Sequence, residues 1–151
     1  MVKSATTNQN HTQIDEKVCL LAQEIRSVLL AVESFYDSLQ SQKLFRNVIF
    51  HKQKVKLENF DDIYIPHLCW VEYIGKKRVY LEWEQIADIL NRANASIDER
   101  ILHIKLHHEF QRLHLEVKSA VNQLKDSIQL SQNFLEMLKN QGISLKMFNK
   151  F

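Results

Sequence analysis

The sequence has very little glycine and proline: two glycines and one proline among 151 residues. All-β folds need many tight turns, which these residues usually build, so their scarcity favours long helices. Cys19 and Cys69 are too few for a disulfide framework or a cysteine-rich metal site, which indicates a reducing, cytoplasmic compartment. No apolar run reaches the length of a membrane span, and the polar start lacks the apolar core of a signal peptide.

Familiar catalytic signatures are also missing. There is no glycine-rich phosphate loop and no Gly-x-Ser-x-Gly elbow. The net charge of +2 is too small to indicate nucleic-acid binding by itself. With 45% hydrophobic and 25% charged residues, the chain can bury an ordinary core, and its length suits one domain.

Apolar residues at alternating spacings of four and three predict a first long helix over residues 13–42. The polar residues 1–11 before it are expected to form a disordered tail. A second helical signal covers residues 82–94. Ser96 followed by Glu99 is a capping box, which predicts a third helix running to Gln141 with Gly142 as its stop.

Two segments between these helices have open interpretations. Residues 43–57 are compatible with a short helix or, because of their β-branched content, a strand. Residues 66–81 form either a short helix between Pro66 and Gly75 or a hairpin around Gly75. The expected architecture is an all-α up-and-down helical bundle with one very long C-terminal helix. It comprises a single helical domain over residues 12–141 and a C-terminal tail over residues 142–151.

The predicted C-terminal helix is apolar on two sides. Such a helix either lies at the centre of its own bundle or is shared with a second copy, so a homodimer or a larger assembly is expected. The same helix carries four histidines, of which His103 and His107 are four residues apart. Two ligands do not make a metal site, so neither a metal nor another cofactor is predicted.

One short stretch, FRNVIFH at residues 45–51, has the residue types for metal-free RNA cleavage. In this reaction the 2′-hydroxyl attacks the neighbouring phosphate. His51 can transfer the proton and Arg46 can hold the phosphate as charge develops. Lys52 and Lys54, directly beyond His51, are candidates for contacts to the RNA backbone.

The pattern of Arg46, Asn47 and His51 resembles the Arg-polar-x-x-x-His motif of HEPN domains. HEPN domains are small all-α proteins, many of them ribonucleases of toxin–antitoxin and antiviral defence systems. The resemblance covers roughly residues 15–105 and includes the segment after the motif, LEWEQIADILNRANASIDERI. It implies a dimeric, metal-independent endoribonuclease in which Arg46 and His51 are catalytic and Asn47 orients or stabilises the site. A protein antitoxin is a further expected partner.

A non-catalytic helical subunit is the alternative interpretation. Scarce glycine, helices apolar on two sides and an apolar C-terminal end suit a protein that docks into a larger assembly equally well. The two functions differ in whether Arg46 and His51 face a common phosphate, which is a question of geometry.

Overall fold

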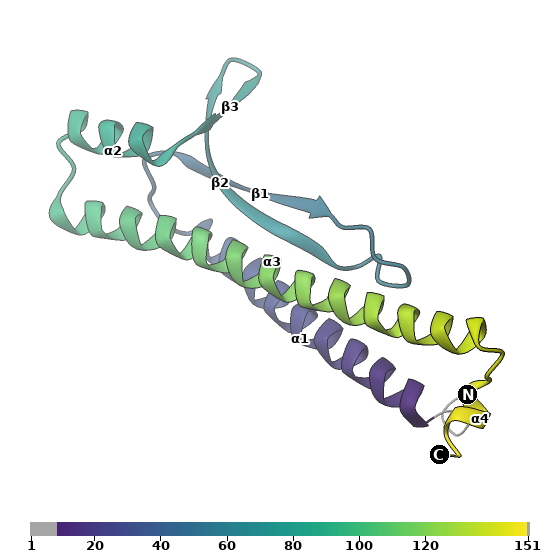
Figure 1. The fold of residues 1–151 in the computed structure, drawn as a ribbon. Coiled ribbons are helices and arrows are strands. Elements are labelled where there is room, and N and C mark those ends of the chain that lie inside the picture. The colour runs from purple at the N-terminus through teal and green to yellow at the C-terminus, as the bar shows by residue number, and fades with distance from the viewer. Residues whose placement is uncertain (1–8, 151) are drawn as a thin grey trace. The chain divides into compact units, whose positions relative to one another are not determined.

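The fold combines two long helices with a small antiparallel sheet (Figure 1). The computed structural model describes residues 9–150, with side chains from Glu16 onward. Helix α1 spans Gln9–Leu39, and it is followed by strands β1 at Asn47–Lys54, β2 at Tyr64–Ile74 and β3 at Lys77–Leu81. Helices α2 at Trp83–Arg92, α3 at Ile97–Asn140 and α4 at Leu145–Phe148 complete the order.

The sheet contradicts the expected all-α bundle. Residues 43–57 contain strand β1 and not a helix, and residues 66–81 form a hairpin around Gly75, whose φ of 62° is one that glycine adopts without strain. Strand β1 alternates: Val48 is buried against the helices and Phe50 packs beside it, while Asn47 and His51 are exposed on the opposite face. A helix would have placed these apolar side chains around its circumference, whereas the strand turns Val48 and Phe50 toward the core together.

The predicted helices are confirmed with small shifts at their ends. Helix α1 begins at Gln9, inside the segment expected to be a tail; the rest of that tail lies outside the described residues. The capping box at the start of α3 is present: the Glu99 N–H donates to Ser96 Oγ at 3.1 Å, and the Ser96 N–H donates to Glu99 Oε1 at 2.9 Å. Gly142 ends α3 with a φ of 66°, and the Ile143 N–H donates to the Leu138 carbonyl.

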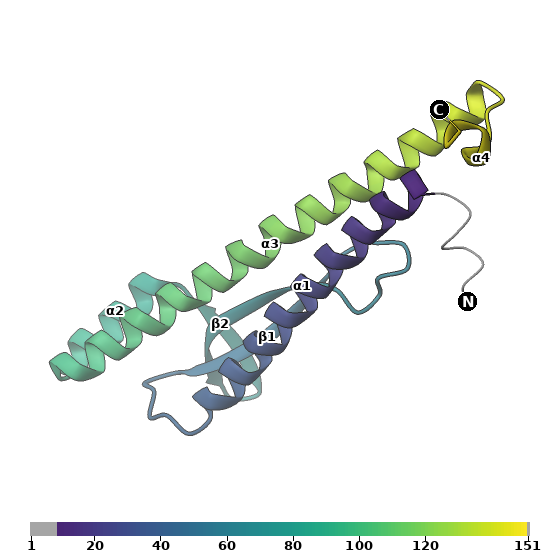
Figure 2. The same ribbon diagram turned by 90° about the horizontal axis from the view of Figure 1, so that it is seen from below.

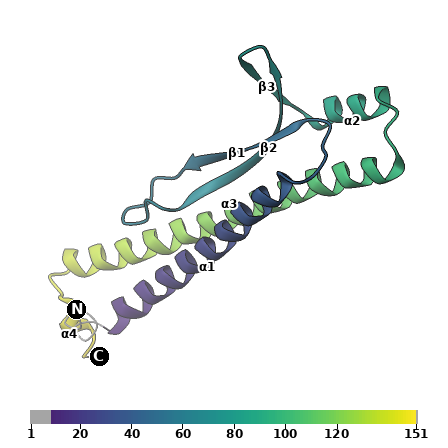
Figure 3. The same ribbon diagram turned by 180° about the vertical axis from the view of Figure 1, so that it is seen from behind.

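The chain divides into two compact units, and both long helices run through both. One unit comprises residues 1–27 and 119–151, where α1 lies beside α3 (Figure 2) and Phe134 contacts Phe148 of α4. The other comprises residues 28–118, including the whole sheet and α2. In this sheet unit, strands β1 and β2 lie over the second half of α1 and the first half of α3 (Figure 3).

Trp70 of β2 lies at the centre of the sheet unit. It is 1% exposed and belongs to an apolar core that also includes Val32 of α1, Ile86 of α2 and Phe110 of α3. Its indole N–H donates to His107 Nδ1 at 3.2 Å, so the one polar atom of the side chain has a partner. His107 also stacks on Trp83, with ring centroids 5.0 Å apart. Both tryptophans of the protein therefore contact the same imidazole.

The three strands are antiparallel in the order β1-β2-β3, and the pairing sets the two faces of the sheet. The face toward the core carries Val48, Phe50 and Lys52 of β1. We call the other face the His51 face. Its members are Asn47, Ile49, His51 and Gln53 of β1, and Ile65, His67, Cys69, Val71 and Tyr73 of β2, none of which is acidic.

Candidate functional site

Arg46 is held by its own neighbours at the start of β1. Its Nη2 lies 3.0 Å from Glu72 Oε1, and its Nη1 donates to the Phe45 carbonyl at 2.7 Å. Its Nε is buried and has no hydrogen-bond partner among the described residues. The guanidinium is thus largely engaged within the protein, which leaves little of it to bind a phosphate.

The segment before Arg46 is anchored from α3. The Phe45 N–H donates to His103 Nε2 at 3.2 Å, and His103 Nδ1 lies 2.7 Å from the Glu99 carbonyl, to which it donates. His103 is 0% exposed, and both of its ring nitrogens have hydrogen-bond partners inside the core. This histidine is structural: it fixes the place where the chain enters β1.

Arg46 and His51 do not face a common phosphate in one chain. Five residues of extended backbone separate them by roughly 17 Å, and an odd separation along a strand turns the two side chains to opposite sides. Asn47, in contrast, lies on the same face as His51. Of the three residues of the motif, the structure therefore places Asn47 and His51 on one surface and Arg46 apart from them.

Lys52 and Lys54 also lie on the side of β1 opposite His51. Lys52 Nζ is 3.6 Å from Glu33 Oε1 of α1 and 4.9 Å from the centre of the Tyr64 ring. Tyr64 donates its own hydroxyl hydrogen to the same Glu33 oxygen at 2.8 Å. Burial and the Glu33 carboxylate together raise the pKa of Tyr64. Lys52 is thus part of the contact between the sheet and α1.

What the structure brings to His51 is two other histidines. His51 on β1 and His67 on β2 are directly paired across the sheet, with ring centroids 6.1 Å apart. Strand β3 pairs with β2 only from Trp70 onward, which leaves the edge of β2 before Trp70 without a neighbouring strand. Helix α3 approaches β2 at this free edge, beside Pro66. There His114 contacts His67, with centroids 4.3 Å apart. We call His51, His67 and His114 the histidine cluster.

Two of these rings are oriented by hydrogen bonds to the protein. His67 Nε2 lies 2.7 Å from Gln53 Oε1, and His114 Nδ1 lies 3.1 Å from the Pro66 carbonyl oxygen. With these oxygens as acceptors, the hydrogens sit on His67 Nε2 and His114 Nδ1. His67 Nδ1 and His114 Nε2 then keep lone pairs that can accept a proton.

The charged groups that act on His67 are basic. Partial burial lowers the pKa of His67 below its usual value, and His114, His51 and Lys118 lower it further by charge repulsion. A neutral His67 is therefore favoured at neutral pH, in a place where further positive charge is unfavourable. Such a site gains stability when an anion binds.

The cluster is accessible to solvent. His51 is exposed, and a surface hollow of about 570 Å³ opens beside His114, lined by His108, Gln111, Arg112, His114 and Leu115. Arg112 in this hollow is paired with Glu109 and Glu116, so its charge is already matched. Among the described residues, no three His, Cys, Asp or Glu side chains are placed to hold one metal ion.

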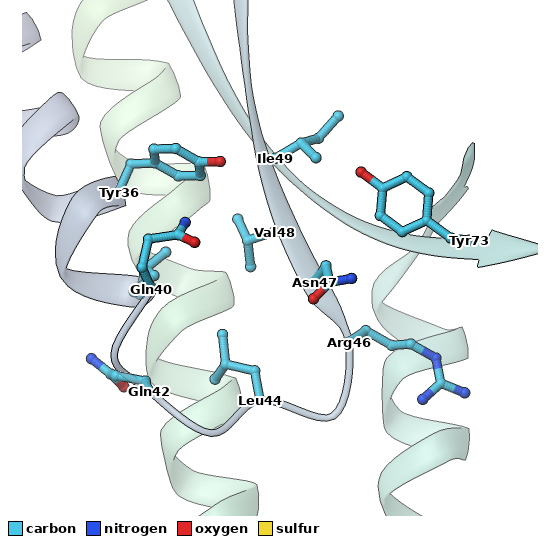
Figure 4. Close-up of a pocket in the computed structure, with 10 residues that line it drawn as sticks. Tyr36, Gln40, Gln42, Leu44, Arg46, Asn47, Val48, Ile49 and Tyr73 are labelled. Carbon is cyan, nitrogen blue, oxygen red and sulfur yellow. The ribbon is translucent and has the colours of Figure 1, made fainter. Parts of the chain in front are cut away.

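Asn47 belongs to a separate pocket at the start of β1, which has a volume of about 290 Å³ (Figure 4). Its other polar residues are Tyr36 of α1, Gln40 and Gln42 just after that helix, Arg46, and Tyr73 of β2. Of the lining residues, Asn47, Ile49 and Tyr73 lie on the His51 face, whereas Val48 lies on the face toward the core.

His67 and His114 were missed as site residues because nothing in their spacing connects them. His67 lies 16 residues after His51 by its number, and His114 lies a further 47 along the chain. Only the register of β1 on β2, together with the position of α3, brings them together. Pairing His51 with His67 from the sequence would have required a strand in each of the two open segments and the correct register between these strands.

Comparisons with known proteins leave the family open: no family model matches the chain, and searches of curated proteins and of solved structures find no match. None of the described helices contains a stretch long and apolar enough to span a bilayer.

Proposed function

We propose that the protein is a metal-independent endoribonuclease whose working groups are the histidine cluster. The observation that carries this proposal is the convergence of three imidazoles from β1, β2 and α3 at a place where the charged groups that act on His67 are basic. The proposal keeps His51 of the HEPN-like motif as a catalytic group. It gives Arg46 a structural role, because Glu72 and the Phe45 carbonyl already hold its guanidinium.

Imidazoles suit this chemistry because they gain and lose protons near neutral pH. In the proposed reaction, the neutral His67 accepts the proton of the 2′-hydroxyl through Nδ1. The 2′-oxygen then bonds to phosphorus as the bond from phosphorus to the 5′-oxygen breaks. His51 gives its proton to that departing oxygen, which leaves a 2′,3′-cyclic phosphate and a 5′-hydroxyl.

Lys118 supplies the remaining charge in this scheme, and His114 can donate to the phosphate when its Nε2 also carries a proton. They lie one helical turn apart on α3, on the side that reaches the free edge of β2. A phosphate between these two side chains and His51 would accept hydrogen bonds from their nitrogens. The His51 face has no carboxylate that competes for these hydrogen bonds. This complementarity favours the phosphodiester over a neutral substrate.

The test is cleavage of a labelled single-stranded RNA in the presence of chelator. Wild type is expected to cleave the RNA, and His67→Ala or His51→Ala is expected to lower the rate by about 10²-fold or more, the usual contribution of a general acid or base. Lys125→Ala removes an exposed cation of α3 that belongs neither to the cluster nor to the hollow beside His114, and it is expected to retain the rate. Cleavage that survives both cluster substitutions, or none by the wild type, contradicts the proposal.

A second candidate function is that of a non-catalytic docking subunit, and one observation favours it. Four apolar side chains on the outer side of α3 are 45–70% exposed: Ile97, Ile101, Ile104 and Leu115. With the exposed His108 and Gln111 between them, they follow the four-three spacing of a coiled-coil seam. We call these four residues the α3 stripe.

We take a second copy of this chain as the partner of the α3 stripe. In an antiparallel arrangement, Ile97 of one copy meets Leu115 of the other, and Asp98 lies near Arg112. The polar His108 and Gln111 then face isoleucines, and polar seam positions of this kind fix register and partner number at some cost in stability. Because His108, Gln111 and Leu115 also line the hollow beside His114, this homodimer would cover that hollow and leave the side of His51 open.

A further inference from the structure

The pocket at the start of β1 has the chemistry of a site for an uncharged, planar ligand. Its polar groups are mainly the amides of Gln40, Gln42 and Asn47 and the phenols of Tyr36 and Tyr73. Figure 4 shows Tyr36 and Tyr73 on opposite sides of strand β1, with Val48 and Ile49 between them, Asn47 on the side of Tyr73 and Gln40 below Tyr36.

Charge selects against an ionic ligand in this pocket. The guanidinium of Arg46 points away from the other polar groups in Figure 4, and Glu72 matches its charge. No carboxylate lines the described pocket. Amides offer both donors and acceptors, and tyrosine offers an aromatic face, which is the combination that proteins use to bind unstacked nucleobases.

The position of the pocket relates it to the histidine cluster. Asn47 and His51 lie on the same face of β1, four residues or roughly 13 Å apart. That length corresponds to at most about four stacked nucleotides at 3.4 Å each. A single RNA strand can therefore follow β1 with a phosphate at the cluster and a base in the pocket.

We propose that this pocket binds one base of single-stranded RNA and thereby gives the enzyme a sequence preference a few nucleotides from the bond that is cut. This inference rests on the proposed endoribonuclease function, and it assigns the substrate contact that the histidines do not provide. Asn47 forms hydrogen bonds with the edge of the base, and Tyr73 or Tyr36 covers its face.

The experiment measures binding of three fluorescent RNA octamers, made of only A, only C or only U, to the His67→Ala variant, which is expected to cut them about 10²-fold more slowly than wild type. One octamer is expected to bind at least about 5-fold more tightly than the others, since a well-placed amide discriminates between bases by that much or more. Adding Asn47→Ala is expected to bring the three affinities within 2-fold of one another. Adding Gln123→Ala instead, an exposed amide outside the pocket, is expected to keep the preference.

The failure of this inference can be told apart from failure of the proposed function. If all three octamers bind equally well, or if the preference persists with Asn47→Ala, the base pocket is wrong while RNA binding stands. If no octamer binds and wild type cuts no RNA, both the base pocket and the proposed endoribonuclease function are wrong. If Asn47→Ala unfolds at the same temperature as wild type, the loss of base preference does not come from a loss of the fold.

Discussion

At the scale of single residues, the contact between His67 and Gln53 controls the proton affinity of the proposed base. Gln53 is an exposed amide, so it orients the ring without attracting the charge that arrives with a proton. A carboxylate in the same place would hold His67 in the same tautomer and would favour its charged form. This makes Gln53 a position at which the pKa of His67 can be changed while its geometry is kept.

Gln53→Glu is therefore expected to raise the pKa of His67. Because the proposed base must be neutral, the acid limb of the pH–rate profile should move to higher pH by the same amount. The profile of RNA cleavage from pH 5 to 8 measures this shift. Gln123→Glu, which adds a carboxylate at an exposed position outside the cluster and the hollow beside His114, is the matched control. An unmoved acid limb in Gln53→Glu would show that His67 is not the base.

At the scale of elements, sequence patterns predicted the helices well because each helix carries its own signals. The capping box at Ser96 and Glu99 and the stop at Gly142 are local features, and both are present in the structure. The strands lacked such signals. In β1, three apolar residues precede four polar ones, so a period of two was not visible. The decisive contribution came from contacts with β2 and the helices, which act over long sequence distances.

The candidate site was predictable only in part, for the same reason. His51 and Asn47 were predicted from the chemistry of a short motif, and they do share a surface. Arg46 was predicted from the same motif, but on a strand its odd separation from His51 points it to the other side. His67 and His114 depend on strand register and helix placement, which a single sequence does not specify.

Helix α3 combines a buried side with an exposed apolar one, and this arrangement leads to a prediction about assembly. If the α3 stripe joins two copies, Ile101→Glu together with Ile104→Glu should place charges in the seam and dissociate the dimer. Analytical ultracentrifugation should then find monomers at concentrations where wild type is dimeric. Leu130→Glu, at an exposed position beyond the stripe, serves as control. A monomeric wild type, or a dimer that resists both glutamates, would contradict the prediction.

At the scale of the whole molecule, buried histidines make folding stability depend on pH. Burial lowers the pKa of His107 despite the nearby carboxylates of Glu84 and Glu82, and it is also the largest cause of the lowered pKa of His67. Both groups bind protons more weakly when folded than when unfolded. Their effect is absent above the unfolded value of about 6.5, and stability falls as the pH drops from there through the lower folded values.

The melting temperature is accordingly expected to fall between pH 7.5 and 5.5, a window in which carboxylates change little. His67→Gln should reduce this fall, because the substituted side chain does not titrate. His108→Gln, at an exposed position, should leave it unchanged. Circular dichroism at 222 nm during heating measures all three proteins. An identical pH dependence in His67→Gln and wild type would show that His67 does not contribute.

The shared contact of both tryptophans with His107 has an optical consequence. A protonated imidazole quenches indole emission far more than a neutral one, and here the same ring touches Trp70 and Trp83, the two tryptophans of the chain. Trp70 also stacks on His103, with ring centroids 5.5 Å apart, so the emission of Trp83 is the part that reports the charge state of His107 alone. A titration followed at the emission maximum can read that state without any label.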